Sequence, residues 1–79
     1  MTAPVKPLDE CVRENLELYF NELGDQTPHS LHEMLVKLVE KPLLETVMAR
    51  CQGNQSRAAD WLGINRNTLR RKLTEHQLL

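Results

Sequence analysis

The sequence predicts an all-α protein of four helices, the last two of which form a helix-turn-helix. Apolar residues recur at steps of three and four, which is the spacing of one helix face, and no stretch has the alternation typical of a strand. Glycine or a capping residue stands near the expected helix ends. A chain of 79 residues makes at most one domain with a limited core. A lone copy would therefore be marginally stable, and association is expected.

Residues 8–23 are expected to form the first helix. Its broad apolar face consists of Leu8, Val12, Leu16, Tyr19, Phe20 and Leu23, with Cys11 beside them. Gly24 should end the helix, because glycine adopts positive φ at no steric cost. Residues 1–7 include Pro4 and Pro7 and are predicted to be a flexible lead. They carry no apolar run typical of a signal peptide, and no stretch could cross a bilayer, so a cytoplasmic protein is expected.

A second helix is expected over residues 30–51. Ser30 and Glu33 suggest a capping box, and Thr27 with Pro28 at the first helical position is the competing start. The apolar face is unusually wide and consists of Leu31, Met34, Leu35, Leu38, Val39, Leu43, Leu44, Val47, Met48 and Cys51. Such a helix is roughly 30 Å long, which is more than the core of one small domain covers. Part of the face is therefore expected to pack against a second copy.

Pro42 lies in the middle of this second stretch. Proline cannot donate to the carbonyl four residues earlier, so the helix must either bend or break there. Because the apolar steps stay in phase from Leu38 and Val39 to Leu43, one kinked helix is predicted. An interior proline costs roughly 3 kcal/mol, which packing within or between subunits would have to offset. Residues 8–51 are predicted to be the dimerisation helices.

Residues 54–77 are predicted to form the helix-turn-helix. Asn54 should cap the first helix through its side-chain oxygen, Gly63 should make the turn, and Asn65 should cap the second helix. The expected inward residues are Ala58, Ala59, Trp61 and Leu62 on the first helix, Ile64 in the turn, and Leu69 and Leu73 on the second. The small side chain of Ala59 should let the second helix cross close over the first.

The charges are divided between the two halves of the chain. Residues 1–49 carry four Lys/Arg and nine Asp/Glu, whereas residues 50–79 carry six Lys/Arg and two Asp/Glu, so the net charge of −1 conceals a basic C-terminal region. In this motif the start of the second helix reaches base edges in the major groove, and nearby basic and hydroxyl groups hold phosphates. The alternative is a merely solvated charged face. The turn geometry favours DNA binding.

No feature indicates an enzyme, a cofactor or a metal site. Cys11 and Cys51 are far apart in the sequence and are expected to be buried thiols. The histidines are expected to be solvated or to cap helices, because His29, His32 and His76 lack partners at catalytic or metal-ligand spacing. There is no nucleophile with a paired base and no glycine-rich phosphate loop. The expected partners are double-stranded DNA and a second copy, with no membrane and no small-molecule substrate.

Several blocks from about Lys6 onward carry a family resemblance. They are Lys6-Pro7-Leu8, Tyr19-Phe20, Pro42-Leu43-Leu44, Val47-Met48, Gly53-Asn54-Gln55, Arg57-Ala58-Ala59, Gly63-Ile64-Asn65-Arg66 and Thr68-Leu69-Arg70. In these blocks the sequence resembles the Fis family of bacterial nucleoid proteins. The resemblance implies an intertwined homodimer, in which the first two helices of each copy, including a helix kinked at proline, interlock in a four-helix core. It also implies transcriptional regulation through DNA bending, with site choice governed by how easily the central minor groove compresses.

The resemblance also assigns roles to particular residues. Asn65 and Arg66 would contact bases, with Arg66 favouring guanine through O6 and N7. The residues implied to hold phosphates are Asn54, Gln55, Ser56, Thr68, Arg70 and Arg71, with Lys72 as a further candidate. The dimer core is expected to include Leu16, Phe20, Leu35, Leu38, Leu43 and Val47.

Three features depart from the family pattern. Few residues precede the first helix, so the N-terminal arm of members that stimulate DNA inversion is not expected, and neither is that activity. Thr74-Glu75-His76 stands where relatives often extend the basic run, which should weaken contacts to flanking DNA. Asn67 stands where glycine is frequent, which should alter the local fit at the groove. Two alternatives remain open: the DNA-binding output domain of an NtrC-type enhancer-binding activator, and a dimerisation module that binds only protein.

Overall fold

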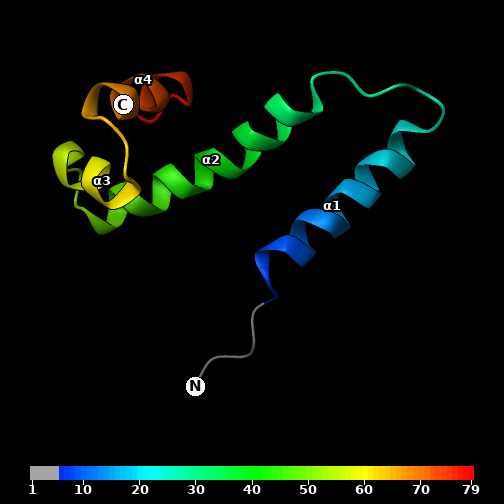
Figure 1. The fold of residues 1–79 in the computed structure, drawn as a ribbon, viewed down its shortest axis with the longest axis horizontal. Helices are drawn as coiled ribbons and strands as arrows, with labels where there is room; N and C mark the ends of the chain where they lie inside the picture. Colours follow the sequence, from blue (N-terminus) through cyan, green and yellow to red (C-terminus); the bar gives the residue numbers. More distant parts are fainter. Residues whose placement is uncertain (1–5) are drawn as a thin grey trace.

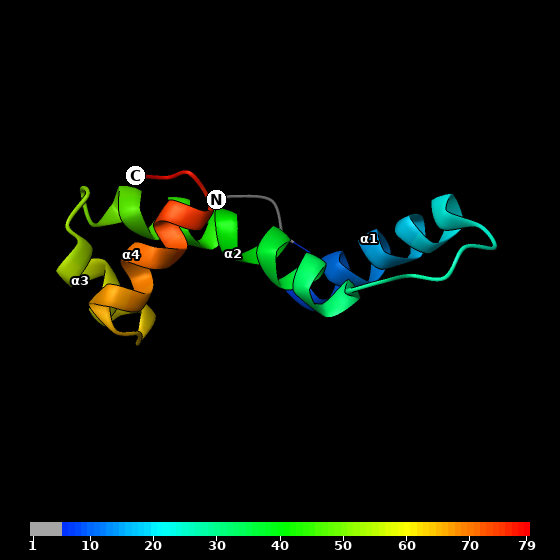
Figure 2. The same ribbon diagram turned by 90° about the horizontal axis from the view of Figure 1, so that it is seen from above.

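The structure, a computed structural model, describes residues 6–79. It contains four helices: α1 (Leu8–Leu23), α2 (Leu31–Arg50), α3 (Gln55–Leu62) and α4 (Arg66–Glu75). No strand occurs in this range, which confirms the all-α class. Figures 1 and 2 show α2 between α1 on one side and the α3–α4 pair on the other. Most of the predicted flexible lead, residues 1–7, lies outside the described residues.

The first two helices form an open hairpin joined by residues 24–30 (Figure 1). Asp9 and Glu10 lie in the first turn of α1, where the helix dipole stabilises carboxylates. Gly24 has a φ of 67°, and its amide donates to the carbonyl of Phe20, so it ends the helix as predicted. No side chain of α1 is fully buried. The apolar face of α1 is therefore incompletely covered in the single chain.

The capping box predicted at the start of α2 is wrong. Ser30 has φ 50° and ψ 38°, a left-handed conformation, and its side chain makes no capping hydrogen bond. A capping side chain reaches the first-turn amides from extended backbone, which Ser30 does not have. Glu33 instead pairs with Lys37, with 3.2 Å between Oε1 and Nζ. The competing start at Pro28 is also wrong, because α2 begins at Leu31.

α2 continues through Pro42 as a single helix, as predicted. Its two halves have different surroundings. In the C-terminal half, Leu44 is only 1 % exposed, and Val47 and Met48 pack against the same core. In the N-terminal half, Leu38 is 63 % exposed. The last turns of α2 therefore belong to the helix-turn-helix core, whereas large apolar side chains of its N-terminal half stay exposed.

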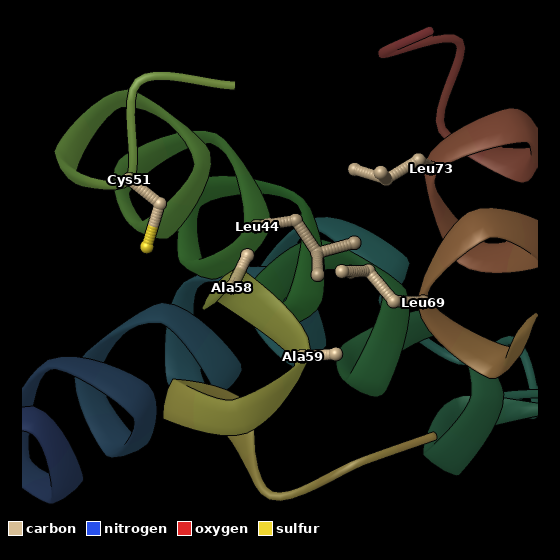
Figure 3. Close-up of a cluster of buried hydrophobic side chains, with 6 residues drawn as sticks. All are labelled: Leu44, Cys51, Ala58, Ala59, Leu69 and Leu73. Carbon is tan, nitrogen blue, oxygen red and sulfur yellow. The ribbon is translucent and has the colours of Figure 1, made fainter. Parts of the chain in front are cut away.

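One hydrophobic core joins α2, α3 and α4. Its buried members are Leu44, Cys51, Ala58, Ala59, Leu69 and Leu73. Figure 3 shows Leu44 pointing toward Leu69 and Leu73, with the two alanines on the α3 side. Leu69 and Leu73 are one turn apart on α4 and 0 % exposed, which confirms the predicted inward face. Small side chains on α3 allow this close packing of the helices.

Both asparagine caps of the helix-turn-helix are confirmed. Asn54 Oδ1 accepts a hydrogen bond from the amide of Arg57 at 3.1 Å. Asn65 Oδ1 accepts one from the amide of Asn67 at 2.7 Å. Both caps have extended backbone, from which the short side chain turns back over the first helical turn. Each cap satisfies an amide that has no partner within its helix.

The turn between α3 and α4 is built around Gly63. Its φ is 72°, a left-handed value that glycine adopts freely. Its amide donates to the carbonyl of Asp60, and the next amide, that of Ile64, donates to the carbonyl of Ala59. This pair of bonds is a Schellman motif, which ends a helix and directs the following apolar residue back onto it. Ile64 accordingly packs against the core, as predicted.

Trp61 does not belong to the inward stripe predicted for α3. It is 57 % exposed. At 3.6 residues per turn, Ala58 and Leu62 share a face and Trp61 lies at its edge. The guanidinium carbon of Arg57 lies 5.8 Å from the Trp61 ring centroid, within cation–π range. The exposed ring is therefore partnered by a cation on the preceding turn.

Candidate nucleic-acid interface

The start of α4 presents polar side chains to solvent. Asn65, Arg66 and Asn67 are all exposed. Because Asn65 Oδ1 already accepts the Asn67 amide, the side-chain amide nitrogen of Asn65 is the group left to donate to a ligand. The Arg66 guanidinium offers paired donors that match O6 and N7 of guanine. The turn thus places an amide and a guanidinium at the part of the motif that reads base edges.

Basic side chains continue along α4. Arg66 and Arg70 are one turn apart, and both are exposed. Arg71 is exposed as well, and its Nε lies 3.9 Å from Oε1 of Glu75. Such an exposed pair contributes little, so a phosphate could replace the carboxylate. Thr68 is half-buried among these cations. The side chains suit contacts to phosphate oxygens.

The other predicted phosphate ligands lie at the start of α3, which packs against α4. First-turn amides of a helix lack helical acceptors and carry partial positive charge, so they attract phosphate oxygens. Asn54 and Ser56 are exposed. Gln55 is half-buried, and its Oε1 is buried without a hydrogen-bond partner. A phosphate would need the amide nitrogen of Gln55, which is its donor.

Lys72 differs from the other predicted phosphate ligands, because its charge has a sheltered partner on another helix. Its Nζ lies 2.7 Å from Oε2 of Glu40 on α2, and Oε1 of Glu40 lies 2.9 Å from Nε2 of His76. The hydrogen bond from Lys72 is the main cause that lowers the pKa of Glu40; partial burial opposes it, and His76 adds to the lowering. A phosphate contact by Lys72 stays a prediction, and it would compete with this carboxylate.

A second surface lies on α1 and on residues 36–43 of α2, and we call it the hairpin surface. Its exposed apolar members are Leu8, Leu18, Phe20, Val36, Leu38, Val39 and Leu43. An apolar groove of about 690 Å³ runs between the two helices. Of the predicted dimer core, Phe20, Leu38 and Leu43 are exposed here, and Leu16 and Leu35 are half-buried. The sixth, Val47, packs against the helix-turn-helix core of its own chain.

Sequence reasoning missed the contact between α2 and the end of α4. It gave Glu40 no role and expected His76 to be solvated or to cap a helix, whereas the His76 side chain is 10 % exposed and contacts Glu40. Glu40 is 32 residues from Lys72 and 36 from His76, so no helical period links them. One signal was available: Glu40 lies one turn before Leu44, on the face of α2 that the other helices cover.

Fold and site together define the class of protein. Two short helices meet at a left-handed glycine, and the second begins with exposed amide and guanidinium groups, so the chain is a helix-turn-helix protein. Residues 35–76 match the family described as "Bacterial regulatory protein, Fis family". Three similar proteins cover most of the chain.

A protein of Neisseria meningitidis serogroup A, named as Fis-like and DNA-binding, is 51 % identical over 79 residues, which cover both chains completely. One of Ralstonia nicotianae with the same name is 49 % identical over 73 residues, 92 % of this chain and 95 % of the relative. The DNA-binding protein Fis of Proteus mirabilis is 46 % identical over 71 residues, 90 % of this chain and 72 % of the relative. The chain belongs to the Fis family, which confirms the resemblance. The family is not one of enzymes, in agreement with the prediction.

Three further features of the described residues concern membrane-spanning helices, metal sites and thiols. Among residues 6–79, no helix combines the length and apolar character needed to cross a membrane. In the same range, His, Cys, Asp and Glu do not gather in groups of three or more that could hold a metal ion. Both cysteines are free thiols; Cys51 is buried as predicted, whereas Cys11 is only half-buried.

Proposed function

We propose that the protein is a homodimeric, nucleoid-associated regulator that binds and bends double-stranded DNA in the cytoplasm. The observation that carries DNA binding is the exposed cationic surface of α4, directly after the glycine turn. The names of the relatives, which include DNA binding, agree with it. The unequal charge of the two halves supports the same function, because cations concentrated on one motif give a local footprint despite the net charge of −1.

Within this proposal, each group of side chains has a distinct role. Asn65 and Arg66 read base edges in the major groove, with Arg66 specifying guanine. The proposed phosphate ligands are Asn54, Gln55, Ser56, Thr68, Arg70 and Arg71. Phosphate contacts set the register of the protein on the duplex, and base contacts supply direct sequence readout. Lys72 is not in this group, because its carboxylate partner in the fold indicates another role.

The hairpin surface supports dimer formation. The radius of gyration is 15.5 Å, whereas a compact domain of this length has about 12 Å. A single chain is thus extended, and it leaves large apolar side chains exposed on α1 and α2, with Leu8 69 % and Leu38 63 % exposed. Contiguous apolar surface of this kind marks an association site. We propose that a second copy packs there through an interface of twofold symmetry.

DNA bending follows from the proposed dimer. Two recognition helices held by one rigid core have a fixed separation, and a duplex whose major grooves are spaced differently must deform to reach both. Membership of the Fis family, whose members bend DNA in this way, supports the proposal. Site choice would then depend on how easily the duplex deforms, besides the contacts of Arg66.

The test is titration of mixed-sequence and selected duplexes with wild-type protein, Arg66→Ala and a matched control, Arg13→Ala. Arg13 is also an exposed arginine, but it lies on α1 and pairs with Asp9. We expect Arg66→Ala to lose roughly 1–3 kcal/mol on its preferred site and to relax specificity at one base position. Arg13→Ala should bind as the wild type does. Affinity should fall with salt at about 0.9 per phosphate neutralised on a double-logarithmic plot.

The same experiments separate the alternatives. A module that only binds protein would show no retarded band at low salt. Equal losses for Arg66→Ala and Arg13→Ala would contradict base reading by Arg66. An output domain of a larger activator would bind DNA in the same way, and a neighbouring ATPase reading frame in the genome would identify it.

A further inference from the structure

The recognition helix α4 is attached to the dimerisation helix α2 by two kinds of contact. One is apolar: Leu69 and Leu73 pack around Leu44, as Figure 3 shows. The other is ionic, and we call it the Glu40 clamp: Glu40 Oε2 to Lys72 Nζ at 2.7 Å, and Glu40 Oε1 to His76 Nε2 at 2.9 Å. The clamp carboxylate therefore has one oxygen for a side chain of α4 and one for the side chain of its C-cap residue.

The clamp is sheltered from solvent. The side chains of Glu40, Lys72 and His76 are 17 %, 29 % and 10 % exposed, respectively. For comparison, the Arg13–Asp9 pair has both side chains 68 % exposed. Water screens exposed pairs, whereas sheltered pairs interact more strongly. The clamp therefore holds its side chains in a definite geometry. The exposed surface pairs contribute little to the stability of the fold.

The placement of the clamp restricts how α4 can turn. Glu40 and Leu44 are one turn apart on α2, and His76, the C-cap residue of α4, lies one turn after Lys72. Apolar contacts depend little on direction, so the leucines alone would allow α4 to roll or tilt on α2. Charge-assisted hydrogen bonds require particular distances and angles. Two such bonds at the C-terminal end of α4 therefore fix its angle relative to α2.

We propose that Glu40 is a positioning residue for DNA binding: through Lys72 and His76 it sets the angle of each recognition helix on the dimerisation helix, and so the spacing of half-sites that a dimer accepts. Lys72 then serves the clamp and not a phosphate. The inference rests on the proposed function. In a twofold dimer any change of the angle occurs in both subunits. A small roll of α4 therefore moves both recognition helices, and the two movements add in the distance between them.

The experiment measures spacing preference. A site selected with the wild-type protein is rebuilt as a series of duplexes in which the half-sites are moved apart or together by single base pairs. Affinities are measured for wild type, Glu40→Gln, Lys72→Met and the double variant. The control is Glu45→Gln, which removes an exposed carboxylate from the same helix and makes the same change of net charge. Circular dichroism checks folding, and Lys72→Met carries the test if Glu40→Gln does not fold.

The expected result is a loss of selectivity and not simply of affinity. The ratio of affinities for the best spacing and its neighbours should fall about fivefold in Glu40→Gln and in Lys72→Met. The double variant should lose no more than Glu40→Gln alone, because that substitution already removes the ion pair with Lys72. Glu45→Gln should keep the wild-type ratio. The salt dependence of Lys72→Met should equal that of the wild type.

Two results would overturn the inference alone. One is an unchanged spacing ratio in Glu40→Gln. The other is a salt slope that is lower by about 1.8 per dimer in Lys72→Met with spacing preference intact, which would make Lys72 a phosphate ligand. Failure of the wild-type protein to bind any duplex would instead remove the proposed function, and this inference with it.

Discussion

Two glutamines hold the left-handed conformation that glycine holds elsewhere in the fold. Gln52 and Gln77 have φ of 54° and 58°. At Gln77, the amide of Leu78 donates to the carbonyl of Leu73 at 2.8 Å, so the residue closes a Schellman motif at the end of α4. A Cβ in this conformation is strained, whereas Gly63 makes the equivalent turn without one.

Gln77→Gly should therefore stabilise the protein. Relief of the strain outweighs the added freedom of the unfolded chain, and the free energy of unfolding should rise by about 0.5–1 kcal/mol. Urea denaturation at one fixed protein concentration measures it. Gln26→Gly is the control, since Gln26 is an exposed turn residue whose φ is not positive. Equal effects of the two substitutions would show that the strain argument is wrong.

The role of a single residue can be predicted from the sequence when the groups that it interacts with lie within a few residues of it. The caps Asn54 and Asn65 and the glycine at 63 act on amides and carbonyls within a few residues, so their roles could be predicted from the sequence. Ser30 is also a capping residue type, but its backbone is left-handed, so residue type alone did not predict its role. The exposure of Trp61 likewise depends on which arc of α3 the neighbouring helices cover.

At the scale of elements, the Glu40 clamp predicts a pH dependence of stability. The pKa of Glu40 in the folded protein lies below its ordinary value of 4.5, chiefly because of the hydrogen bond from Lys72. A lowered pKa contributes stability that is fully present above the ordinary pKa and is lost as pH falls through the folded-state pKa. Other charged groups near the clamp are Lys37 and Glu75, which line the groove beside His76.

The difference in free energy of unfolding between wild type and Glu40→Gln should therefore shrink as the pH falls below about 4.5. Urea denaturation across this range measures it. Glu45→Gln controls for the change of net charge. A difference that is independent of pH down to complete acid unfolding would show that the Glu40 carboxylate gains nothing from its partners.

The helices themselves were largely predictable, because periodicity and stop signals are repeated along each one. The bounds of α1 agree with the prediction, and α2 runs through Pro42 as one helix because its apolar residues stay in phase across the proline. Contacts between the helices were harder to predict from the sequence. The leucines of α4 could be predicted to face inward, but their partner Leu44 could not be distinguished from Leu43 by hydropathy alone.

At the scale of the whole molecule, the sequence indicated an acidic apolar half and a basic half, and in the structure α2 joins them, with its last turns packed against α3 and α4 and its other end leading to α1 (Figure 2). The helix-turn-helix core is complete within one chain, whereas α1 has no buried side chain. The wide apolar face of residues 30–51 therefore divides into a part that Leu69 and Leu73 cover and a part that stays exposed in the single chain. This division could not be predicted from the sequence alone, because it depends on which part of α2 packs against α4.

The proposed dimer can be tested by substituting two leucines that are equally exposed in the single chain. Leu38 on the hairpin surface and Leu79 after α4 are both 63 % exposed in the single chain. In an isolated chain, Leu38→Glu and Leu79→Glu should each change stability by no more than about 0.5 kcal/mol. In the dimer, Leu38→Glu would bury an unpaired charge in both subunits, which costs several kcal/mol, whereas Leu79→Glu would leave the charge in water.

Sedimentation equilibrium at micromolar protein, with thermal unfolding at several concentrations, should show the difference. The wild type and Leu79→Glu should sediment as dimers, and their unfolding midpoints should rise with concentration because association stabilises the folded state. Leu38→Glu should be a monomer or unfolded, and it should lose the DNA affinity that depends on two half-sites bound together. A wild-type protein that stays a folded single chain would contradict the dimer. Equal behaviour of the two variants would instead place the interface away from Leu38.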